Sequence, residues 1–188
     1  EVDEAIRSRR THKAYRPEPV DRETLDELLD LARWAPNHHL TNPWRFRVLG
    51  PGALERLKRA AGPEAATKLD RAPTLVVCSC AIPDDEVQAE EDLHATAIAA
   101  YIVLLAAHAR GLVGYWRTPG VLRTEEGREA VALGPEERFV ALIHLGHPVQ
   151  EKAAPCGGLS AEACAHTTRR PLPCACGTCP RWPSSRDV

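Results

Sequence analysis

The hydrophobic residues in the first 150 positions alternate between the spacing of helices and the spacing of strands. Behind an N-capping Asp21, apolar residues recur along one helix face, at Leu25, Leu28, Leu29 and Ala32. This spacing predicts a helix that ends near Ala35, because Pro36 disfavours the helical conformation of the residue before it. Shorter helices are predicted over residues 2–10, 53–61 and 124–133.

Strand patterns fall between these helices. Trp44, Phe46 and Val48 alternate with two arginines, which predicts a half-exposed strand. The continuous apolar run at 74–78 predicts a buried strand. Two further strands are predicted over residues 112–116 and 139–145.

The longest predicted helix covers residues 93–110, follows an acidic stretch at 84–92 and is terminated by Gly111. It is apolar on almost every face, so we expect it to be buried all round. One small domain rarely encloses such a helix, which makes a subunit interface a natural place for it. Its uninterrupted apolar run, 97–107, is too short to cross a bilayer, so no membrane span is expected.

Composition narrows the class of protein. The chain has 188 residues, 44% hydrophobic and 27% charged, with a formal net charge of -2. These values suit one domain with a substantial core and exclude a generally basic nucleic-acid binder. Because no charged-then-apolar leader opens the sequence, we expect a cytoplasmic protein.

The character of the sequence changes after Lys152, which predicts a domain over 1–152 and an irregular, Cys- and Pro-rich tail over 153–188. The tail carries Cys156, Cys164, Cys174, Cys176 and Cys179. With His166 they offer enough soft ligands for zinc, but a lone C-x-x-C is a weak zinc signal. A segment translated in a shifted reading frame, or plain disorder, explains the composition better than a metal site.

Three polar stretches, 9–13, 35–44 and 111–120, are candidates for ligand binding. The first combines arginine forks, a lysine and a threonine hydroxyl, all of which bind phosphate. Taken singly, a solvated helix end explains the first stretch better and an ordinary loop connection is slightly favoured for the second, whereas the third fits a ligand edge or simply a strand end. No G-x-G-x-x-G, phosphate-loop or G-x-S-x-G motif occurs, which removes support for a Rossmann site, a P-loop enzyme or a serine hydrolase.

Taken together and in order, these stretches resemble the nitroreductase family of flavin enzymes, in its compact branch. The resemblance covers roughly residues 3–150. It rests on Arg9-Arg10-Thr11-x-Lys13, a helix ending in Ala35-Pro36, Asn42-Pro43-Trp44, the long apolar helix, Trp116-Arg117-Thr118 and Leu145-Gly146-x-Pro148.

The resemblance implies an α+β fold, with a mostly antiparallel central sheet flanked by helices and the long apolar helix at the interface of a homodimer. It also implies FMN bound at that interface. The enzyme would pass a hydride from NADH or NADPH through flavin N5 to a nitroaromatic, a quinone or a similar acceptor in a ping-pong cycle. Two alternatives stay open: other flavin chemistry on the same fold, such as dehalogenation or flavin destruction, and a non-catalytic flavin- or metal-binding module that uses the tail.

The same resemblance assigns roles to individual residues. Arg9, Arg10 and Thr11 would hold the FMN phosphate and ribityl chain, and Lys13 would offset charge on the reduced ring. Trp34 and His38 would contact the flavin held by the other subunit, and Asn42 would meet the ring edge. Trp116, Arg117 and Thr118 would form a later flavin-contacting segment. No catalytic acid or base is expected, because the cofactor carries the redox chemistry.

Overall fold

A four-stranded antiparallel sheet forms the centre of the domain. The computed structural model describes residues 2–150 and 152. The strands run in the order β1-β2-β4-β3 across the sheet, so β1 and β3 are its edges. Their bounds are β1 (Trp44–Val48), β2 (Thr74–Ala81), β3 (Val113–Arg117) and β4 (Glu137–Gly146).

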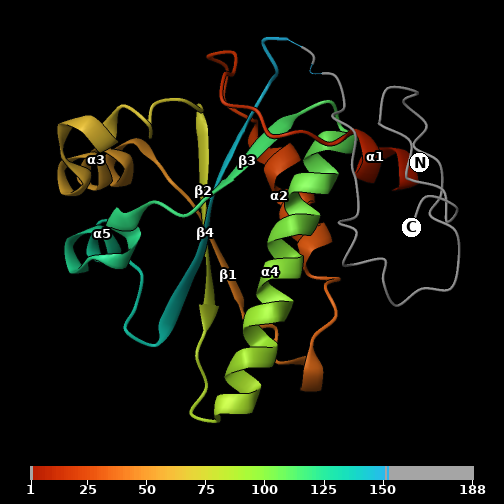
Figure 1. Cartoon of the computed structure of the whole chain (residues 1–188), viewed down its shortest axis with the longest axis vertical. Coiled ribbons are helices and arrows are strands. Elements are labelled where there is room, and N and C mark those ends of the chain that lie inside the picture. Colours follow the sequence, from red (N-terminus) through yellow and green to blue (C-terminus); the bar gives the residue numbers. More distant parts are fainter. Residues whose placement is uncertain (1, 151, 153–188) are drawn as a thin grey trace, which may run out of the picture. The chain divides into compact units, whose positions relative to one another are not determined.

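Helices cover both faces of the sheet (Figure 1). On one face lie α2 (Arg22–Ala32) and α4 (Glu86–Ala109), which bury a core with the inward side chains of the strands. On the other face, α3 (Pro51–Ala66) and α5 (Glu125–Ala130) bury a second core. The short α1 (Val2–Ser8) lies beside the C-terminal end of α4. The α+β class and the antiparallel sheet predicted from the sequence are thus confirmed.

The helices α2 and α4 form where the sequence predicted them, but the observed start of α4 differs from the prediction. The Asp21 carboxylate accepts a hydrogen bond from the Thr24 amide and caps α2, as predicted. The long helix begins at Glu86 rather than at residue 93, because Asp85 caps it and the acidic stretch forms its first turns. Gly111, at φ 75, ends this helix as predicted.

The other helices also differ in length from their predictions. α1 ends at Ser8 and α2 at Ala32, short of their predicted ends at residues 10 and 35. α3 extends to Ala66 across a break at Gly62 (φ 75), where the sequence predicted an end at residue 61. Gly62 tolerates this backbone conformation because it has no Cβ. α5 ends at Ala130, three residues short of its predicted end, and Thr124 caps its first turn.

Within a single chain, the long helix α4 is not buried all round, so the burial predicted for its remaining face would require a subunit interface, which stays a prediction. Eight of its residues are buried, but Ile98 is 42% exposed and Tyr101 is 39% exposed. The half-buried Ile102 and Leu105 continue the same stripe at helical spacing. An apolar stripe along the outer side of α4 therefore stays uncovered by residues 2–150 and 152.

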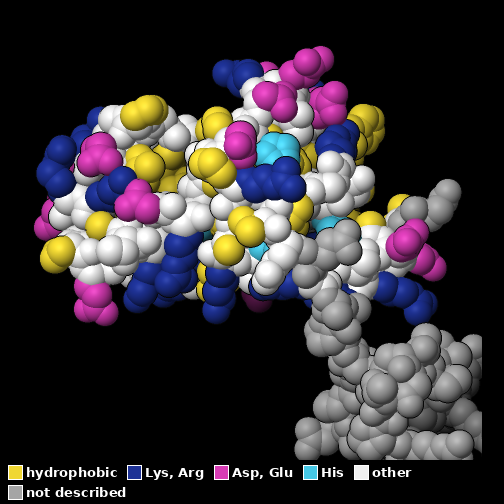
Figure 2. All heavy atoms as spheres, turned by 90° about the horizontal axis from the view of Figure 1, so that it is seen from above, with side chains coloured by type: hydrophobic (Ala, Val, Ile, Leu, Met, Phe, Trp, Pro, Cys, Tyr) yellow, Lys and Arg dark blue, Asp and Glu magenta, His cyan; other side chains and the backbone are white. Residues whose placement is uncertain are grey.

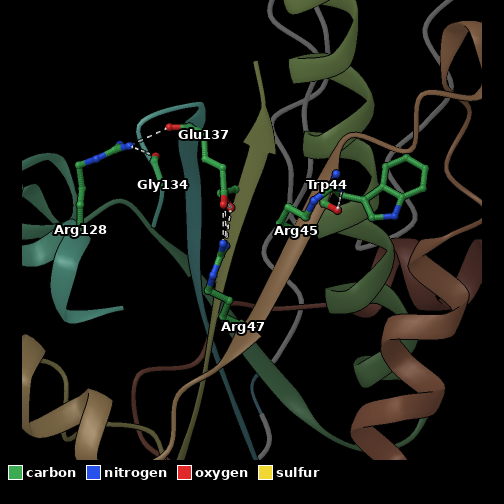
Figure 3. Close-up of polar contacts among 7 residues, drawn as sticks. Trp44, Arg45, Arg47, Arg128, Gly134 and Glu137 are labelled. Carbon is green, nitrogen blue, oxygen red and sulfur yellow. Dashed lines mark hydrogen bonds and ion pairs between the residues drawn. The ribbon is translucent and has the colours of Figure 1, made fainter. Parts of the chain in front are cut away.

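The edge strand β1 departs from simple alternation, because one of its arginines is drawn inward. Arg47 donates to the Glu137 carboxylate of β4 at 2.5 Å and to the Ser79 hydroxyl of β2 at 3.0 Å (Figure 3). Val48 is instead exposed. Arg128 donates to the carbonyls of Glu137 and Gly134, so this polar cluster ties α5 and three strands together.

In the part of the chain that the structure describes, α4 is the one helix long and apolar enough to cross a membrane, judged by length and composition alone. A core helix of a globular domain satisfies the same test, and α4 packs against the sheet and α2. The predicted tail over 153–188, with its cysteines, lies outside the described residues.

Candidate functional site

The basic motif, residues 9–13, runs along the edge of β3 that does not pair with β4. Thr11 forms a parallel bridge with Gly114, and the His12 amide donates to the Gly114 carbonyl at 3.2 Å. Two stretches that lie a hundred residues apart in the sequence, 9–13 and 111–120, are therefore side by side. The structure brings these two predicted groups of ligand-binding residues together.

Gly114 lets α4 come close to this edge. A Cβ at this position would lie 2.4 Å from the Leu104 side chain of α4 and 3.3 Å from the His144 carbonyl. Only a residue without a side chain fits here unless the helix moves away. The edge of β3, the basic motif and the C-terminal half of α4 therefore form one compact unit.

Two arginine side chains in this unit have unsatisfied donors. The Arg9 guanidinium lies 5.9 Å from the centre of the Tyr101 ring, and Arg10 donates to the carbonyls of Arg7 and Arg9. Within the part of the chain that the structure describes, the Nε atoms of both arginines are buried without a hydrogen-bond partner. Among residues 2–150 and 152, no carboxylate pairs with Arg9, Arg10 or Lys13. Buried, unpaired cationic donors of this kind fit an anionic group such as a phosphate.

A further cation at this site escaped the sequence prediction. The Lys152 ammonium donates to the Thr11 carbonyl at 2.9 Å. Burial lowers the pKa of the neighbouring His12, and the positive charges of Lys152 and His108 lower it further. Figure 2 looks down on the molecule from above the view of Figure 1 and shows several Lys and Arg side chains on that face. The local field therefore favours an anion.

The segment at the end of β3 splits across the two faces of the sheet. Trp116 packs on the α4 side, whereas Arg117 donates to the Lys68 carbonyl at 3.0 Å on the opposite side. The Arg117 guanidinium also lies 3.5 Å from Nε2 of the buried His144. Thr118 follows the strand and is exposed. These three residues share a location but do not point the same way.

The loop that carries His38 and Asn42 lies at the other end of α4. The His38 ring contacts Glu91 at 2.8 Å, near the start of the helix. Trp34, 80% exposed, follows α2. The Asn42 side-chain amide donates to the Leu40 carbonyl of its own loop at 2.8 Å.

These two groups of residues cannot meet around one small ligand within a single chain. The basic motif lies beside Tyr101 and Leu104, and the His38 loop lies beside Glu91. At about 1.5 Å of rise per residue, Glu91 and Leu104 are about 20 Å apart along the helix. Figure 1 shows α1 and the α2–β1 connection at opposite ends of α4.

The fold and the basic edge define a protein that can bind an anionic ligand, and comparison with known proteins identifies its family. The sequence model of the nitroreductase family matches residues 6–147. The chain therefore belongs to the nitroreductase family of NAD(P)H-dependent oxidoreductases, which confirms the resemblance.

Individual relatives agree with this assignment. A Bacillus subtilis protein named as an NAD(P)H nitroreductase is 26% identical over 159 residues, covering 76% of this chain and 82% of the relative. A nitroreductase-type protein from Desulfovibrio desulfuricans, solved in complex with FMN, has a TM-score of 0.73 at 28% identity. That match covers 92% of this chain and 98% of the other. The 5,6-dimethylbenzimidazole synthase of Rhodospirillum rubrum is 28% identical over 199 residues, covering 92% of each protein.

Proposed function

We propose that this protein binds FMN and uses it to transfer electrons from NADH or NADPH to a small organic acceptor. The observation that carries the proposal is the pair of buried, unpartnered Nε atoms of Arg9 and Arg10 beside the β3 edge. The FMN complex of the D. desulfuricans relative supports the choice of ligand. Bound FMN would supply the redox chemistry, accepting two electrons from the nicotinamide and passing them to the acceptor in a separate half-reaction.

The residues at the β3 edge would hold the phosphate end of FMN. Arg9 and Arg10 offer unused donors, and Lys13 and Lys152 add positive charge within the same region. Thr11 is exposed at the centre of this group, where its hydroxyl is free to bind the ribityl chain. Trp116 and Thr118 would border the ring. The side chain of Arg117 is held by Lys68 on the opposite face, so its contribution would be to support the strand end.

The ring would complete its site with a second copy of the chain. The exposed stripe on α4 contains Ile98, which lies midway between the basic motif and the His38 loop along the helix. If two copies pack their α4 helices antiparallel about a two-fold axis near Ile98, the partner subunit's His38 lies beside the basic motif of the first chain. Trp34 and Asn42 would accompany His38. We therefore propose a homodimer with FMN at its interface. We also propose that the protein is cytoplasmic.

An absorbance titration tests the proposal. Purified protein is titrated with FMN, and reduced nicotinamide is then added without oxygen, NADH and NADPH in separate samples. We expect saturable binding, bleaching near 450 nm, and recovery on addition of a nitroaromatic or quinone. A steady-state rate study in which both substrates are varied should give the parallel lines of a ping-pong cycle. Absence of FMN binding at micromolar concentrations would refute the proposal.

The interface has its own test. Ile98→Asp places a charge in the centre of the α4 stripe and should yield a monomer by sedimentation, with loss of FMN binding. Ile82→Asp is the matched control, because Ile82 is 45% exposed but lies in the connection between β2 and α4, outside the α4 stripe. A dimer that survives Ile98→Asp would place the interface elsewhere.

A second candidate function is destruction of the flavin. The R. rubrum relative named 5,6-dimethylbenzimidazole synthase covers 92% of this chain, which favours this alternative over dehalogenation. The discriminating measurement is recovery of the 450 nm band after reduction and exposure to air. Full recovery supports the electron-transfer function, whereas permanent loss with a new product supports flavin destruction.

A further inference from the structure

The loop that carries His38 has an unfavourable backbone conformation. His39 and Leu40 both have φ 53, and Asn42 has φ 46, all in the left-handed region that residues with a Cβ rarely adopt. None of the three is glycine. Leu40, 77% exposed, gains little from burial that would offset the strain. Contacts with the rest of the protein must therefore hold this loop in place.

Hydrogen bonds inside the loop shape it without attaching it. The Asn42 amide donates to the Asn37 side-chain oxygen at 3.0 Å, and the Asn42 side chain donates to the Leu40 carbonyl. Both bonds begin and end within residues 37–42. They leave open what fixes the loop against α4.

Two side-chain contacts make that attachment, and they differ in strength. The His38–Glu91 pair has exposed fractions of 59% and 41%, and pairs of that exposure contribute little. The second contact is buried at one end: the Thr41 hydroxyl donates to the Asp92 carboxylate at 2.6 Å, and Asp92 is 4% exposed. A hydrogen bond from a hydroxyl to a carboxylate in that environment is the stronger of the two.

Asp92 is an unusual residue for its position. Its other hydrogen-bond partner is the Gln88 amide at 3.0 Å, and within residues 2–150 and 152 no cation pairs with it. Burying a carboxylate with only neutral donors is costly compared with an apolar residue in the same helix. A packing role alone would be served better by alanine or leucine, which points to a role for the Thr41 contact.

We infer that Asp92 is a positioning residue, which acts through Thr41 to hold the strained 37–42 loop so that His38 faces the flavin of the partner subunit. This inference rests on the proposed function. It assigns to α4 a second role, because the same helix would supply the dimer contact through Ile98 and the loop attachment through Asp92. Asp92 itself touches no ligand in this arrangement.

Four substitutions separate positioning from simple stability. Thr41→Val keeps the shape and removes the hydroxyl, and Thr41→Ser keeps the hydroxyl. Asp92→Asn keeps an oxygen acceptor for Thr41. Gln88→Ala is the matched control, because Gln88 donates to the same Asp92 oxygen but forms no hydrogen bond with the loop among the described residues. The readouts are the FMN dissociation constant, the melting temperature and hydrogen exchange of a peptide that contains residues 37–42.

We expect Thr41→Val to raise the FMN dissociation constant about tenfold, which corresponds to the loss of one such contact. Exchange in the 37–42 peptide should also become faster. Thr41→Ser and Asp92→Asn should stay within about twofold of the unmodified protein, and Gln88→Ala should change the melting temperature only. The inference is overturned if Thr41→Val leaves FMN affinity and loop exchange unchanged, or if Gln88→Ala changes both as much.

The exchange measurement keeps this inference distinct from the proposed function. If the unmodified protein binds no FMN, the proposed function fails. Exchange of the 37–42 peptide in Thr41→Val and Gln88→Ala still shows whether Asp92 holds the loop. Slow exchange that depends on Thr41 but not on Gln88 supports the attachment, and equal exchange in all variants rejects it.

Discussion

Replacing Arg9 by methionine should weaken FMN binding strongly without destabilising the FMN-free protein. Methionine keeps the apolar part of the side chain near Tyr101 and removes the charge and the donors. The buried Arg9 Nε has no hydrogen-bond partner among residues 2–150 and 152, so its removal relieves a desolvation cost. A residue that served only the fold would show the reverse behaviour.

The magnitudes follow from the contacts. An unsatisfied buried donor costs about 1–3 kcal/mol, whereas the Arg9–Tyr101 cation–π contact contributes about 0.5–1 kcal/mol. The two effects oppose each other, so Arg9→Met should change the free energy of unfolding by about 0–2.5 kcal/mol, in the stabilising direction. A charge-assisted hydrogen bond to a phosphate contributes about 1.5–3 kcal/mol, and its loss should weaken FMN binding about 10- to 100-fold.

The assay pairs two measurements on the same samples. Urea unfolding of the FMN-free protein gives the stability, and a fluorescence titration gives the FMN dissociation constant. Arg22→Met is the control, because Arg22 forms an exposed surface pair with Asp26 and lies on α2, away from the β3 edge. It should leave both quantities unchanged. A loss of stability with unaltered FMN affinity in Arg9→Met would refute the assignment of Arg9 to the phosphate site.

Three further predictions concern the fold. Gly127→Ala should destabilise the domain by about 3 kcal/mol or more in urea unfolding, because its Cβ would lie 1.8 Å from the Val121 carbonyl oxygen, whereas Gly120→Ala meets open space and should be neutral. Burial opposes the charge of Glu137, but hydrogen bonds from Arg47 and Ser79 outweigh it and lower the pKa of this carboxyl from 4.5. The charged Glu137 carboxylate therefore stabilises the fold above about pH 4.5, and this stabilisation is lost as the pH falls through the lowered pKa of the folded protein. Glu137→Gln should be less stable at pH 7 and should lose less stability on acidification. A pH profile of stability identical to that of the unmodified protein would contradict the pairing of Glu137 with Arg47 and Ser79. Burial lowers the pKa of His144 to about 3, with help from the charges of Arg117 and Arg71, so the unfolded chain takes up a proton below about pH 6.5 that the folded chain refuses. His144→Gln should then flatten the fall in stability between pH 6.5 and 3 by up to about 1.4 kcal/mol per pH unit, measured by urea unfolding across that range.

The sequence was sufficient for the features that depend on neighbouring residues. The apolar spacing behind Asp21 predicted α2 and its cap, and the continuous run at 74–78 predicted the buried strand that became β2. The acidic stretch at 84–92 was predicted to precede the long helix, whereas most of it forms the first turns of α4. Charge alone does not distinguish the first turns of a helix from the loop before it. The local signal for the true start was Asp85, a good N-cap residue, whose side chain accepts a hydrogen bond from the backbone amide of Gln88 three residues later.

The sequence indicated most residues of the candidate site but not how their side chains are arranged in space. The basic motif and the Trp116–Thr118 segment were expected at one ligand, yet period-2 alternation sends Arg117 to the face opposite Trp116. Lys152 was missed because its contact with Thr11 spans almost the whole domain, and no local pattern encodes such a pairing. In the sequence, Asp92 is one residue of the acidic stretch at 84–92, and nothing local indicates the burial that the structure shows.

The separation of the two half-sites along α4 has a genetic consequence. Each FMN would depend on the basic motif of one chain and the His38 loop of the other, so a mixed dimer of Arg9→Met and His38→Ala chains carries both lesions in one site and none in the other. Two variants that fail separately should therefore complement each other after subunit exchange. The recovered capacity would approach one FMN in each mixed dimer, a stoichiometry that a site confined within a single chain could never produce.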